Sequence, residues 1–472
     1  MNRTPFLILV VVVAFLGGCN LAPTYTRPEA PVPAAWPVSA AGQQAARPGE
    51  AAPDVAWRDF FVDEKLRQVI GLALANNRDL RVAALNVERT QALYRIQRAE
   101  LLPTVDARGT FSKERVPGIL SQAGQPATLE LYNVNLGVSS WEIDLFGRIR
   151  NLKDAALDQY FATEQARASA QITLVSAVAN TWLTLAADRE NVKLAQSTLE
   201  TQQATYEMIR RRAEVGASSD LDLRQAKTRV DAARVDIARY TSQVALDENA
   251  LTLLVGSPVP PGLLPVELGE VAALKDFTPG LPSEVLQSRP DILQAESQLR
   301  AAHANIGAAR AALFPRITLT TSIGTTSDQL SGLFTSGSGT WAFVPQIVIP
   351  IFDARSWVAY DVTKVDREIA LAQYEKAIQT GFREVADALA QRGTLGDQLE
   401  AQQSLVDASA DGYRLSDARF VRGIDSYLRV LDAQRSLYGA QQGLIAIRLA
   451  RLTNLVTLYK VLGGGALSNE GR

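Results

Sequence analysis

Two long parts of the chain repeat apolar residues at alternating spacings of three and four, the pattern of a helix packed in a coiled coil. They cover residues 148–212 and 354–420. The seam positions are Ile172, Val175, Ala179, Trp182 and Ala186, then Leu371, Tyr374, Ile378, Gly381, Val385 and Ala388. At about 1.5 Å per residue such a helix is on the order of 100 Å long. A turn and a second long helix follow each one, so the pattern predicts two long helical hairpins.

Four shorter segments are predicted to be strands, at residues 103–113, 129–142, 316–326 and 341–352. In two of them the side chains alternate between an apolar and a polar or small set. The apolar set is Tyr132, Val134, Leu136 and Val138 in the second segment. In the third segment it is Ile317, Leu319, Thr321 and Ile323. Transmembrane barrel strands alternate in this way, with apolar residues toward lipid and polar residues toward water. A half-buried sheet in a soluble protein alternates in the same way.

The order of these elements occurs twice, at an offset of about 207 residues. Each copy is expected to contain a first helix (63–101 or 282–313), two strands, and a long hairpin. Pro103 and Pro315 end the first helices, because proline cannot continue one. The expected parts are a signal peptide 1–18, an extended segment 19–62, a first repeat 63–256 with its tip near 213–220, a connection 257–281, a second repeat 282–463 with its tip near 421–426, and a tail 464–472.

The first residues have the features of a bacterial lipoprotein signal. A short basic start leads into an apolar run, 6–15, and then into Leu16-Gly17-Gly18-Cys19. Cleavage before Cys19 would leave that cysteine to carry a covalent lipid. Asn20 follows it, and the absence of an aspartate there favours the outer membrane. A plain signal peptide with an incidental cysteine is the alternative. The apolar run is too short to span a bilayer, and no later stretch is expected to be a transmembrane helix.

Composition excludes several classes of function. The net charge is −2, so no nucleic-acid partner is expected. A single cysteine excludes an internal disulfide framework. A single histidine, His303, makes a histidine-based metal site or catalytic base improbable, and it is expected to be a surface or packing residue of a helix. No nucleophile–base pair, phosphate loop or metal cluster is found. We therefore expect no enzyme activity, no metal and no cofactor other than the lipid on Cys19.

The number of predicted strands bears on assembly. Four strands cannot close a barrel, because the smallest bacterial barrels have about eight. An open edge in lipid leaves backbone groups unpaired, at several kcal/mol each. If these strands enter a membrane, several chains must share them, and three chains would supply twelve.

Over essentially its whole length the chain resembles the TolC family of outer membrane factors, in its lipoprotein branch of OprM and NodT type. The matching motifs are Ala22-Pro23-Thr24-Tyr25-Thr26-Arg27-Pro28, Trp57-Arg58-Asp59-Phe60-Phe61, Ser288-Arg289-Pro290-Asp291-Ile292, Gly423-Ile424-Asp425-Ser426-Tyr427-Leu428 and Leu431-Asp432-Ala433-Gln434-Arg435-Ser436-Leu437-Tyr438. The resemblance implies an α+β membrane protein with an internal duplication. Its homotrimer would form a 12-stranded transmembrane β-barrel, continuous with a long periplasmic coiled-coil α-barrel.

The resemblance also implies a function. The trimer would be the exit duct of a tripartite efflux pump in the outer membrane of a Gram-negative bacterium. A periplasmic adaptor would grip its tip, and an inner-membrane transporter of the resistance-nodulation-division (RND) type would drive the export of drugs or other small solutes. A type I protein-secretion channel and a lipidated periplasmic adaptor are the alternatives, and a lipid-anchored enzyme is a more distant one.

The resemblance places a pore constriction near the second tip. Asp432 occupies the position of a family pore aspartate, and Leu428 and Asp425 precede it by four and seven residues, which predicts one helical stripe. Threefold symmetry would turn each into a ring, and a carboxylate ring favours cations. TolC has a further pore aspartate one turn earlier, where this chain has Arg429, so a double ring is not expected.

Contacts at the tip are expected to resist opening. The candidate cross-repeat partners are Arg419, Arg422 and Asp425 with Glu214, Asp220 and Asp222, around Gly216 and Gly423. Ordinary helix capping is the alternative, with Arg210-Arg211-Arg212 near the end of one helix and Ser219 or Asp220 near the start of the next.

Overall fold

The computed structural model describes residues 20–33, 35–37, 52–121, 124–271, 274–275 and 288–465. They belong to two compact units. Unit 1 combines Met1–Pro28, Val87–Thr163 and Ala295–Tyr374, and unit 2 combines Glu29–Asn86, Glu164–Gln294 and Glu375–Arg472. Cys19, the expected signal peptide and the expected helix start at residue 282 lie outside the described residues.

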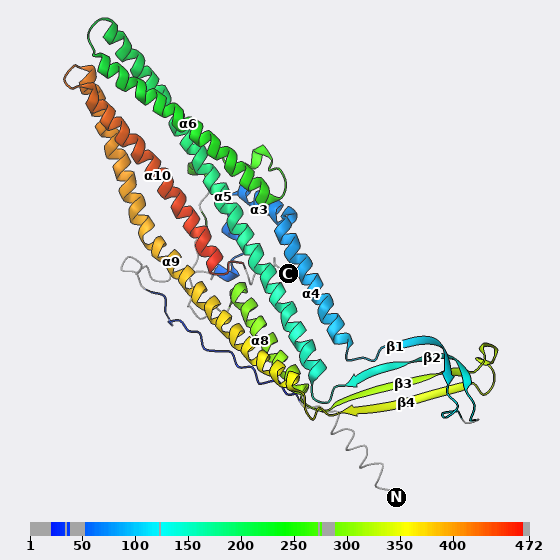
Figure 1. The fold of residues 1–472 in the computed structure, drawn as a ribbon. Coiled ribbons are helices and arrows are strands. Elements are labelled where there is room, and N and C mark those ends of the chain that lie inside the picture. The colour runs from blue at the N-terminus through cyan, green and yellow to red at the C-terminus, as the bar shows by residue number, and fades with distance from the viewer. Residues whose placement is uncertain are drawn as a thin grey trace. The chain divides into compact units, whose positions relative to one another are not determined.

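Unit 1 contains an antiparallel sheet in the order β1-β2-β3-β4 (Figure 1). The strands are β1 (Val105–Val116), β2 (Ala127–Ile143), β3 (Arg316–Ser327) and β4 (Gly339–Val348). β4 ends four residues before the expected limit at 352. Pro350 follows and has no N–H to donate to the ladder. β1 and β4 each have a neighbour on one side only, so each leaves an open edge.

The strand register gives the sheet one apolar and one polar face. Leu136 pairs with Ala107 and with Ile323, and Ile323 pairs with Trp341, so these side chains share a face. This face also carries the apolar side chains of Val105, Phe111, Tyr132, Val134, Val138, Phe343 and Ile347, and near the loop between β1 and β2 it carries the Lys113–Glu130 ion pair. The opposite face carries Asp106, Arg108, Thr110, Asn133, Asn135, Ser322 and Thr326. Because Trp341 and Phe343 are 76% and 61% exposed, the chain itself does not cover the apolar face.

A β-bulge at Ser140 keeps this separation intact. Val138 faces Thr321 and Trp141 faces Leu319, so β2 has one extra residue at this point. Ser140 takes a positive φ of 55°, which is uncommon for a residue other than glycine. Without the extra residue, Glu142 would lie on the apolar face; with it, Trp141 and Ile143 do.

The helices form two long hairpins and several shorter elements (Figure 1). The first hairpin is α5 (Arg148–Glu214) with α6 (Asp220–Val255), and the second is α9 (Ala354–Val421) with α10 (Tyr427–Val461). The other helices are α2 (Trp57–Phe60), α3 (Glu64–Asn76), α4 (Arg78–Ala99) and α8 (Pro290–Ala311). Short 3₁₀ turns lie at Ala52–Asp54, Pro261–Leu263, Leu268–Glu270 and Leu330–Gly332.

The helix expected over 63–101 is in fact two helices, and that prediction was wrong. Asn77 interrupts it with an extended backbone (ψ 131°). The Asn77 side chain accepts a hydrogen bond from the Leu80 N–H at 2.8 Å, which caps α4, and donates one to the Leu254 carbonyl at 2.8 Å. The break interrupts the helix, and in return Asn77 caps α4 and contacts the end of α6.

By length and composition, one helix in the described ranges, α5, could cross a membrane. The sequence predicts no such helix after the signal peptide. Because 56% of the apolar window is buried within the chain, the same observation fits a core helix.

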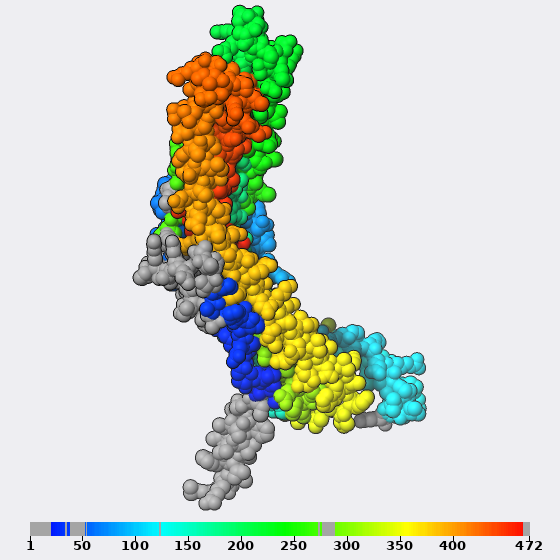
Figure 2. Space-filling model, turned by 90° about the vertical axis from the view of Figure 1, so that its left-hand side faces the viewer, coloured from blue at the N-terminus to red at the C-terminus, as the bar shows by residue number. Residues whose placement is uncertain are grey.

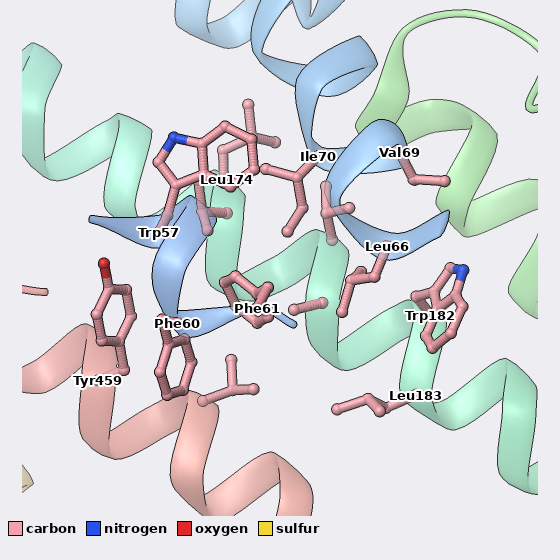
Figure 3. Close-up of a cluster of buried hydrophobic side chains, with 14 of the residues drawn as sticks. Trp57, Phe60, Phe61, Leu66, Val69, Ile70, Leu174, Trp182, Leu183 and Tyr459 are labelled. Carbon is pink, nitrogen blue, oxygen red and sulfur yellow. The ribbon is translucent and has the colours of Figure 1, made fainter. Parts of the chain in front are cut away.

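The core of unit 2 joins residues 52–76 to both hairpins (Figure 3). The Phe60 ring stacks on Tyr459 of α10 at 4.2 Å between centroids, with 4° between the planes. The Tyr459 hydroxyl donates to the Val55 carbonyl at 2.7 Å. Trp182 of α5 is 1% exposed, and its indole N–H donates to the Leu263 carbonyl at 3.1 Å. Each such side chain contributes about 1.5–3 kcal/mol by burial.

A buried arginine fastens the start of α8 to α9 and α10. The Arg289 side chain is 7% exposed and donates to both carboxylate oxygens of Asp291, at 3.0 and 2.6 Å. It also donates to Glu384 of α9 at 2.8 Å and to the Val461 carbonyl at 2.7 Å. Burial by itself would lower the pKa of Arg289, but the bonds to Asp291 and Glu384 outweigh it and raise the pKa. The guanidinium therefore remains charged in the interior.

Arg289→Ala should lower the unfolding free energy by about 2–4 kcal/mol. The change leaves the carbonyl of Val461 and two carboxylates without their donor, and the partial exposure of both carboxylates keeps the loss near or below the range for fully buried pairs. Denaturant unfolding of the detergent-solubilised protein measures it. Arg414→Ala is the matched control, because its pair with Asp411 is exposed on both sides and should be worth under about 1 kcal/mol. We call these contacts of Arg289 the Arg289 clamp. Equal losses of unfolding free energy in Arg289→Ala and Arg414→Ala would contradict it.

Candidate functional site

The two hairpin turns in unit 2 have the same backbone geometry. Gly216 and Gly423 take positive φ angles of 73° and 75°. The Ala217 N–H donates to the Arg212 carbonyl at 2.8 Å, and the Ile424 N–H donates to the Arg419 carbonyl at 2.9 Å. Each of these hydrogen bonds spans five residues, which is the pattern of a helix that ends at a glycine with left-handed backbone. A side chain at either glycine would meet no neighbour, so left-handed backbone, not space, requires glycine there.

The helices that follow the turns are capped differently. Ser219 and Asp222 form a reciprocal capping box at the start of α6. Ser426 precedes α10 with an extended backbone but makes no side-chain cap bond. In the first hairpin the cap is therefore formed by Ser219, which the capping alternative named, together with Asp222.

An ion pair crosses the second turn. Arg419 donates from Nε to Asp425 Oδ2 at 2.6 Å and from Nη2 to Oδ1 at 3.2 Å. This two-point contact lowers the pKa of Asp425, chiefly through the hydrogen bond from Arg419. The turn is thus closed by an ion pair between Arg419 of α9 and Asp425, the residue before the N-cap of α10.

The expected ion pairs between the two repeats are not formed within one chain. In the described ranges Glu214 lies near Arg210, at 3.8 Å, and Asp222 is used in the capping box. Asp220 lies in the first turn of α6, where the helix dipole favours an acid. Within the same ranges Arg422 has no ion-pair partner, and its N–H bonds to the Ala418 carbonyl.

The two hairpins are joined below the tip by an apolar cluster. Ile209 of α5 and Ala226 of α6 pack with Phe420 of α9 and with Tyr427, Val430 and Leu431 of α10. The Arg212 guanidinium lies over the Phe420 ring at 5.0 Å. Burial raises the pKa of Tyr427 to about 12. The cluster fixes which face of α10 is turned inward.

The opposite face of α10 exposes two of the predicted pore residues. Leu428 is 61% exposed, and the Asp432 side chain is 71% exposed. They are one turn apart on the helix and project from the same side. Arg435, which the sequence analysis did not single out, donates to Asp432 Oδ1 at 3.0 Å. The exposed carboxylate therefore has a cation beside it.

The third predicted pore residue does not belong to this stripe. Asp425 lies in the turn, before the N-cap Ser426, and α10 begins only at Tyr427. Helical spacing therefore does not apply to it, and its carboxylate is held by Arg419. The prediction that Asp425, Leu428 and Asp432 share one helical stripe was wrong for Asp425.

Polar side chains set the orientation of α10 further from the tip. Gln434, 8% exposed, accepts from Gln202 of α5 at 3.1 Å and donates to the Tyr413 hydroxyl of α9 at 3.1 Å. Two more bonds join α10 to α6: Tyr438 to Asp236 at 3.1 Å, and Gln442 to the Tyr240 hydroxyl at 3.0 Å. Burial and the Asp236 carboxylate raise the pKa of Tyr438, so it remains a donor.

These partners are separated by 202 residues in both α10–α6 bonds. The sequence signal for them is the equal four-residue spacing on the two helices, 438 and 442 against 236 and 240, which becomes visible only once the helices are known to be adjacent. Within the described ranges no group of three or more His, Cys, Asp or Glu residues is placed to hold a metal ion.

Known proteins share this sequence and fold. A family model described as outer membrane efflux protein matches residues 69–257 and 281–464. The probable efflux pump outer membrane protein TtgC of Pseudomonas putida is 50% identical over 472 residues, covering 99% of this chain and 97% of its own. The outer membrane protein OprJ of Pseudomonas aeruginosa is 41% identical, covering 100% of this chain and 98% of its own.

A solved structure gives the same result. The MtrE outer membrane channel of Neisseria gonorrhoeae, in its open state, superposes with a TM-score of 0.84 at 37% identity, covering 95% of this chain and 99% of its own. The predicted resemblance is confirmed, and so is the outer membrane location in a Gram-negative bacterium. The family is one of efflux channels and not of enzymes. The chain belongs to the outer membrane efflux protein family.

Proposed function

We propose that three copies of this chain form the exit duct of a tripartite efflux pump, with their sheets joined into one 12-stranded barrel across the outer membrane and their hairpins in the periplasm. A periplasmic adaptor and an RND-type inner-membrane transporter complete the pump. The duct itself performs no chemistry. Drugs or other small solutes are its cargo, in line with the efflux names of the relatives.

The sheet is the observation that carries this proposal. Its apolar face is uncovered, and β1 and β4 are open at one edge each. In lipid those edges need partners, because each unpaired backbone group costs several kcal/mol. An even number of antiparallel strands makes β1 and β4 run in opposite directions. β4 of one copy can therefore pair with β1 of the next in the same antiparallel pattern around a closed ring.

Uncovered helix stripes in unit 1 support the same assembly. Val358, Val362, Val365 and Ile369 of α9 are at least half exposed and recur at spacings of four, three and four. Leu93 and Ile96 of α4 form a second exposed apolar strip. Heptad-spaced apolar strips of this kind normally pack against another helix. We propose that neighbouring copies supply it.

Two further features complete the proposal, a lipid anchor near the N-terminus and a constriction on α10. Cys19 carries a covalent lipid, as Leu16-Gly17-Gly18-Cys19 suggests. Leu428 and Asp432 form two rings at the constriction, since they are the exposed face of α10. Arg435 moderates the negative charge of the Asp432 ring, because its guanidinium is 3.0 Å from Asp432 Oδ1.

The assembly is tested by purifying the protein in detergent and recording its conductance in planar bilayers. A trimer that resists dissociation in mild SDS and conducts ions is expected. A monomer without conductance would contradict the duct, and a lipidated periplasmic adaptor would behave in that way. Export of a polypeptide, with no change in drug susceptibility on deletion, would favour the type I secretion alternative.

Two neighbouring positions of β4 test the direction of the sheet. Phe343 lies on the apolar face and Ala342 on the polar face. Phe343→Lys should weaken membrane insertion by about 2–4 kcal/mol if it faces lipid near the bilayer centre. Ala342→Lys should insert normally and shift ion selectivity toward anions. Refolding into lipid vesicles measures insertion, and reversal potentials measure ion selectivity. If Ala342→Lys inserts poorly and Phe343→Lys inserts normally, the polar face and not the apolar face of the sheet is directed toward lipid.

The charge pair on α10 gives opposite predictions for its two members. Asp432→Ala should raise single-channel conductance and reduce cation selectivity, because it removes a carboxylate ring. Arg435→Ala should increase cation selectivity, because it frees that carboxylate. Arg414→Ala is the control, because this exposed arginine of α9 pairs with Asp411 and not with Asp432. Unchanged conductance and selectivity in Asp432→Ala would refute its place in the constriction.

A further inference from the structure

The apolar face of the sheet in unit 1 ends in a group of charged side chains at the loop between β1 and β2. From Val105 this face of β1 continues to Phe111, whose ring lies 4.7 Å from that of Tyr132 on β2. The next residues of β1 on the same face are Lys113 and Arg115. Figure 2 shows the cyan residues of the β1–β2 hairpin at the surface of the protein. An apolar band followed by aromatic rings is the order of side chains along a strand that leaves a bilayer.

The group consists of two cations and one acid. Lys113 Nζ lies 2.5 Å from Glu130 Oε1, and the two side chains are 57% and 37% exposed. Arg115 is exposed and lies opposite Thr128, and in the part of the chain that the structure describes it has no ion-pair partner. Lys113, Arg115 and Glu130 are called the charged rim below. The rim has an excess of positive charge and one guanidinium that is open to a ligand.

Both cations of the rim lie on one face of the strands. At the same level the opposite face carries Ser112 and Glu114 on β1, paired with Leu131 and Leu129 on β2. Among the described positions of β1 and β2 beyond Phe111, that opposite face has no lysine or arginine. Contact with water alone would not separate the cations in this way, because both faces would be equally wet. The rim therefore belongs to the apolar face that it continues.

The rim lies about one bilayer thickness from the start of the strand. Ten strand steps separate Val105 from Arg115, and at about 3.4 Å each they cover roughly 34 Å. A strand tilted by about 40° rises roughly 26 Å over that length, which matches the apolar band of outer-membrane barrels. Because β1 follows α4, Val105 is at the periplasmic side of the proposed assembly. The rim is then at the headgroups of the outer leaflet.

A hollow of about 450 Å³ lies on the same face of the sheet. Its apolar lining, at least half exposed in each case, is Val105, Leu136, Ile323, Trp341 and Phe343. Leu136 pairs with Ala107, which precedes Lys113 by six residues on β1, a separation of roughly 20 Å along the strand. An alkyl chain that begins at the rim and runs into the bilayer therefore passes along the hollow.

We propose that this face of the sheet binds lipid A, the phosphorylated glycolipid part of lipopolysaccharide, with a phosphate at Lys113 and Arg115 and an acyl chain in the hollow. Lipopolysaccharide makes up the outer leaflet of a Gram-negative outer membrane, which is the level of the rim. The planar fork of Arg115 matches two phosphate oxygens, and Lys113 adds a point charge that Glu130 holds in position. The inference rests on the proposed function, because the sheet must span the outer membrane.

Binding is measured on the purified trimer in detergent, by titration with lipid A and native mass spectrometry. One lipid A molecule per copy is expected. It should bind about tenfold or more tightly than dephosphorylated lipid A, which has the same acyl chains, because the charge-assisted bonds to phosphate are lost. Phosphatidylglycerol should also bind more weakly, since its phosphodiester carries less negative charge than a phosphate monoester. Equal affinities for the three lipids would overturn the site and indicate non-specific lipid contact.

Substitutions in the rim test which side chains hold the phosphate. Lys113→Gln combined with Arg115→Gln should weaken lipid A binding about tenfold or more. Arg108→Gln is the matched control, because it removes the same charge from the polar face of β1 and should bind as the wild type does. Unchanged binding in the double variant, or an equal loss in Arg108→Gln, would overturn the phosphate site. If the double variant does not assemble, Arg115→Gln alone decides, because it breaks no ion pair among the described residues.

The acyl-chain position is tested at Trp341. Trp341→Ala should weaken lipid A binding about three- to tenfold, because the indole supplies a large part of the hollow. Trp357→Ala is the control, since this tryptophan of α9 is also exposed and does not line the hollow. Equal effects of the two substitutions would overturn the position of the chain.

Failure of the lipid site and failure of the proposed duct are distinguishable. Conductance of the same preparation in planar bilayers reports the duct. A conducting trimer without preference for lipid A would refute the lipid site alone, whereas a monomer without conductance would refute the assembly on which it rests.

Discussion

Backbone groups within a bilayer have no water to bond, and this constraint governs the sheet of unit 1. Its strands satisfy one another across three ladders, but β1 and β4 keep one open edge each. Unpaired N–H and C=O groups along a strand would cost more than a domain's net stability, so neither edge can remain open in lipid. In the proposed trimer the edges of neighbouring copies satisfy each other, and the exposed apolar strips of α4 and α9 gain partners in the same step. Membrane insertion and oligomerisation are then one physical event, which explains why a single chain leaves so much apolar surface uncovered.

A different kind of interaction fixes the orientation of the long helices. Apolar seams alone allow neighbouring helices to slide or rotate, because one small residue packs much like another. Polar contacts in the interior remove that freedom, since each unsatisfied partner is costly. Gln434, Tyr438 and Gln442 bond to three other helices. They keep one side of α10 inward, and Leu428 and Asp432 are left on the other. The Arg289 clamp has a comparable role where α8, α9 and α10 meet.

Much of the fold could be predicted because its signals are local. Heptad spacing placed α5 and α9 to within about two residues of their observed ends. Alternation located the apolar face of β2 and β3, and glycine located both hairpin turns, because only a left-handed residue closes a helix end in this way. Asp432 was identified from the family resemblance, and Leu428 from its position four residues earlier on the same helix. Asp425 departs from that spacing because it lies in the turn, where helical periodicity no longer describes the direction of a side chain.

The sequence by itself determined the hairpins, the strands, the turns and the family, since each depends on residues within a few positions of one another or on long motifs. Tertiary structure alone decided the break at Asn77, the bulge at Ser140 and the partners of Arg289, Gln434 and Tyr438. Asp236 and Tyr438 are 202 positions apart, and Gln202 and Gln434 are 232 apart. Nothing in the local chain tells such a side chain which partner it will meet. That is set by which helices pack together, and packing is a property of the whole folded chain.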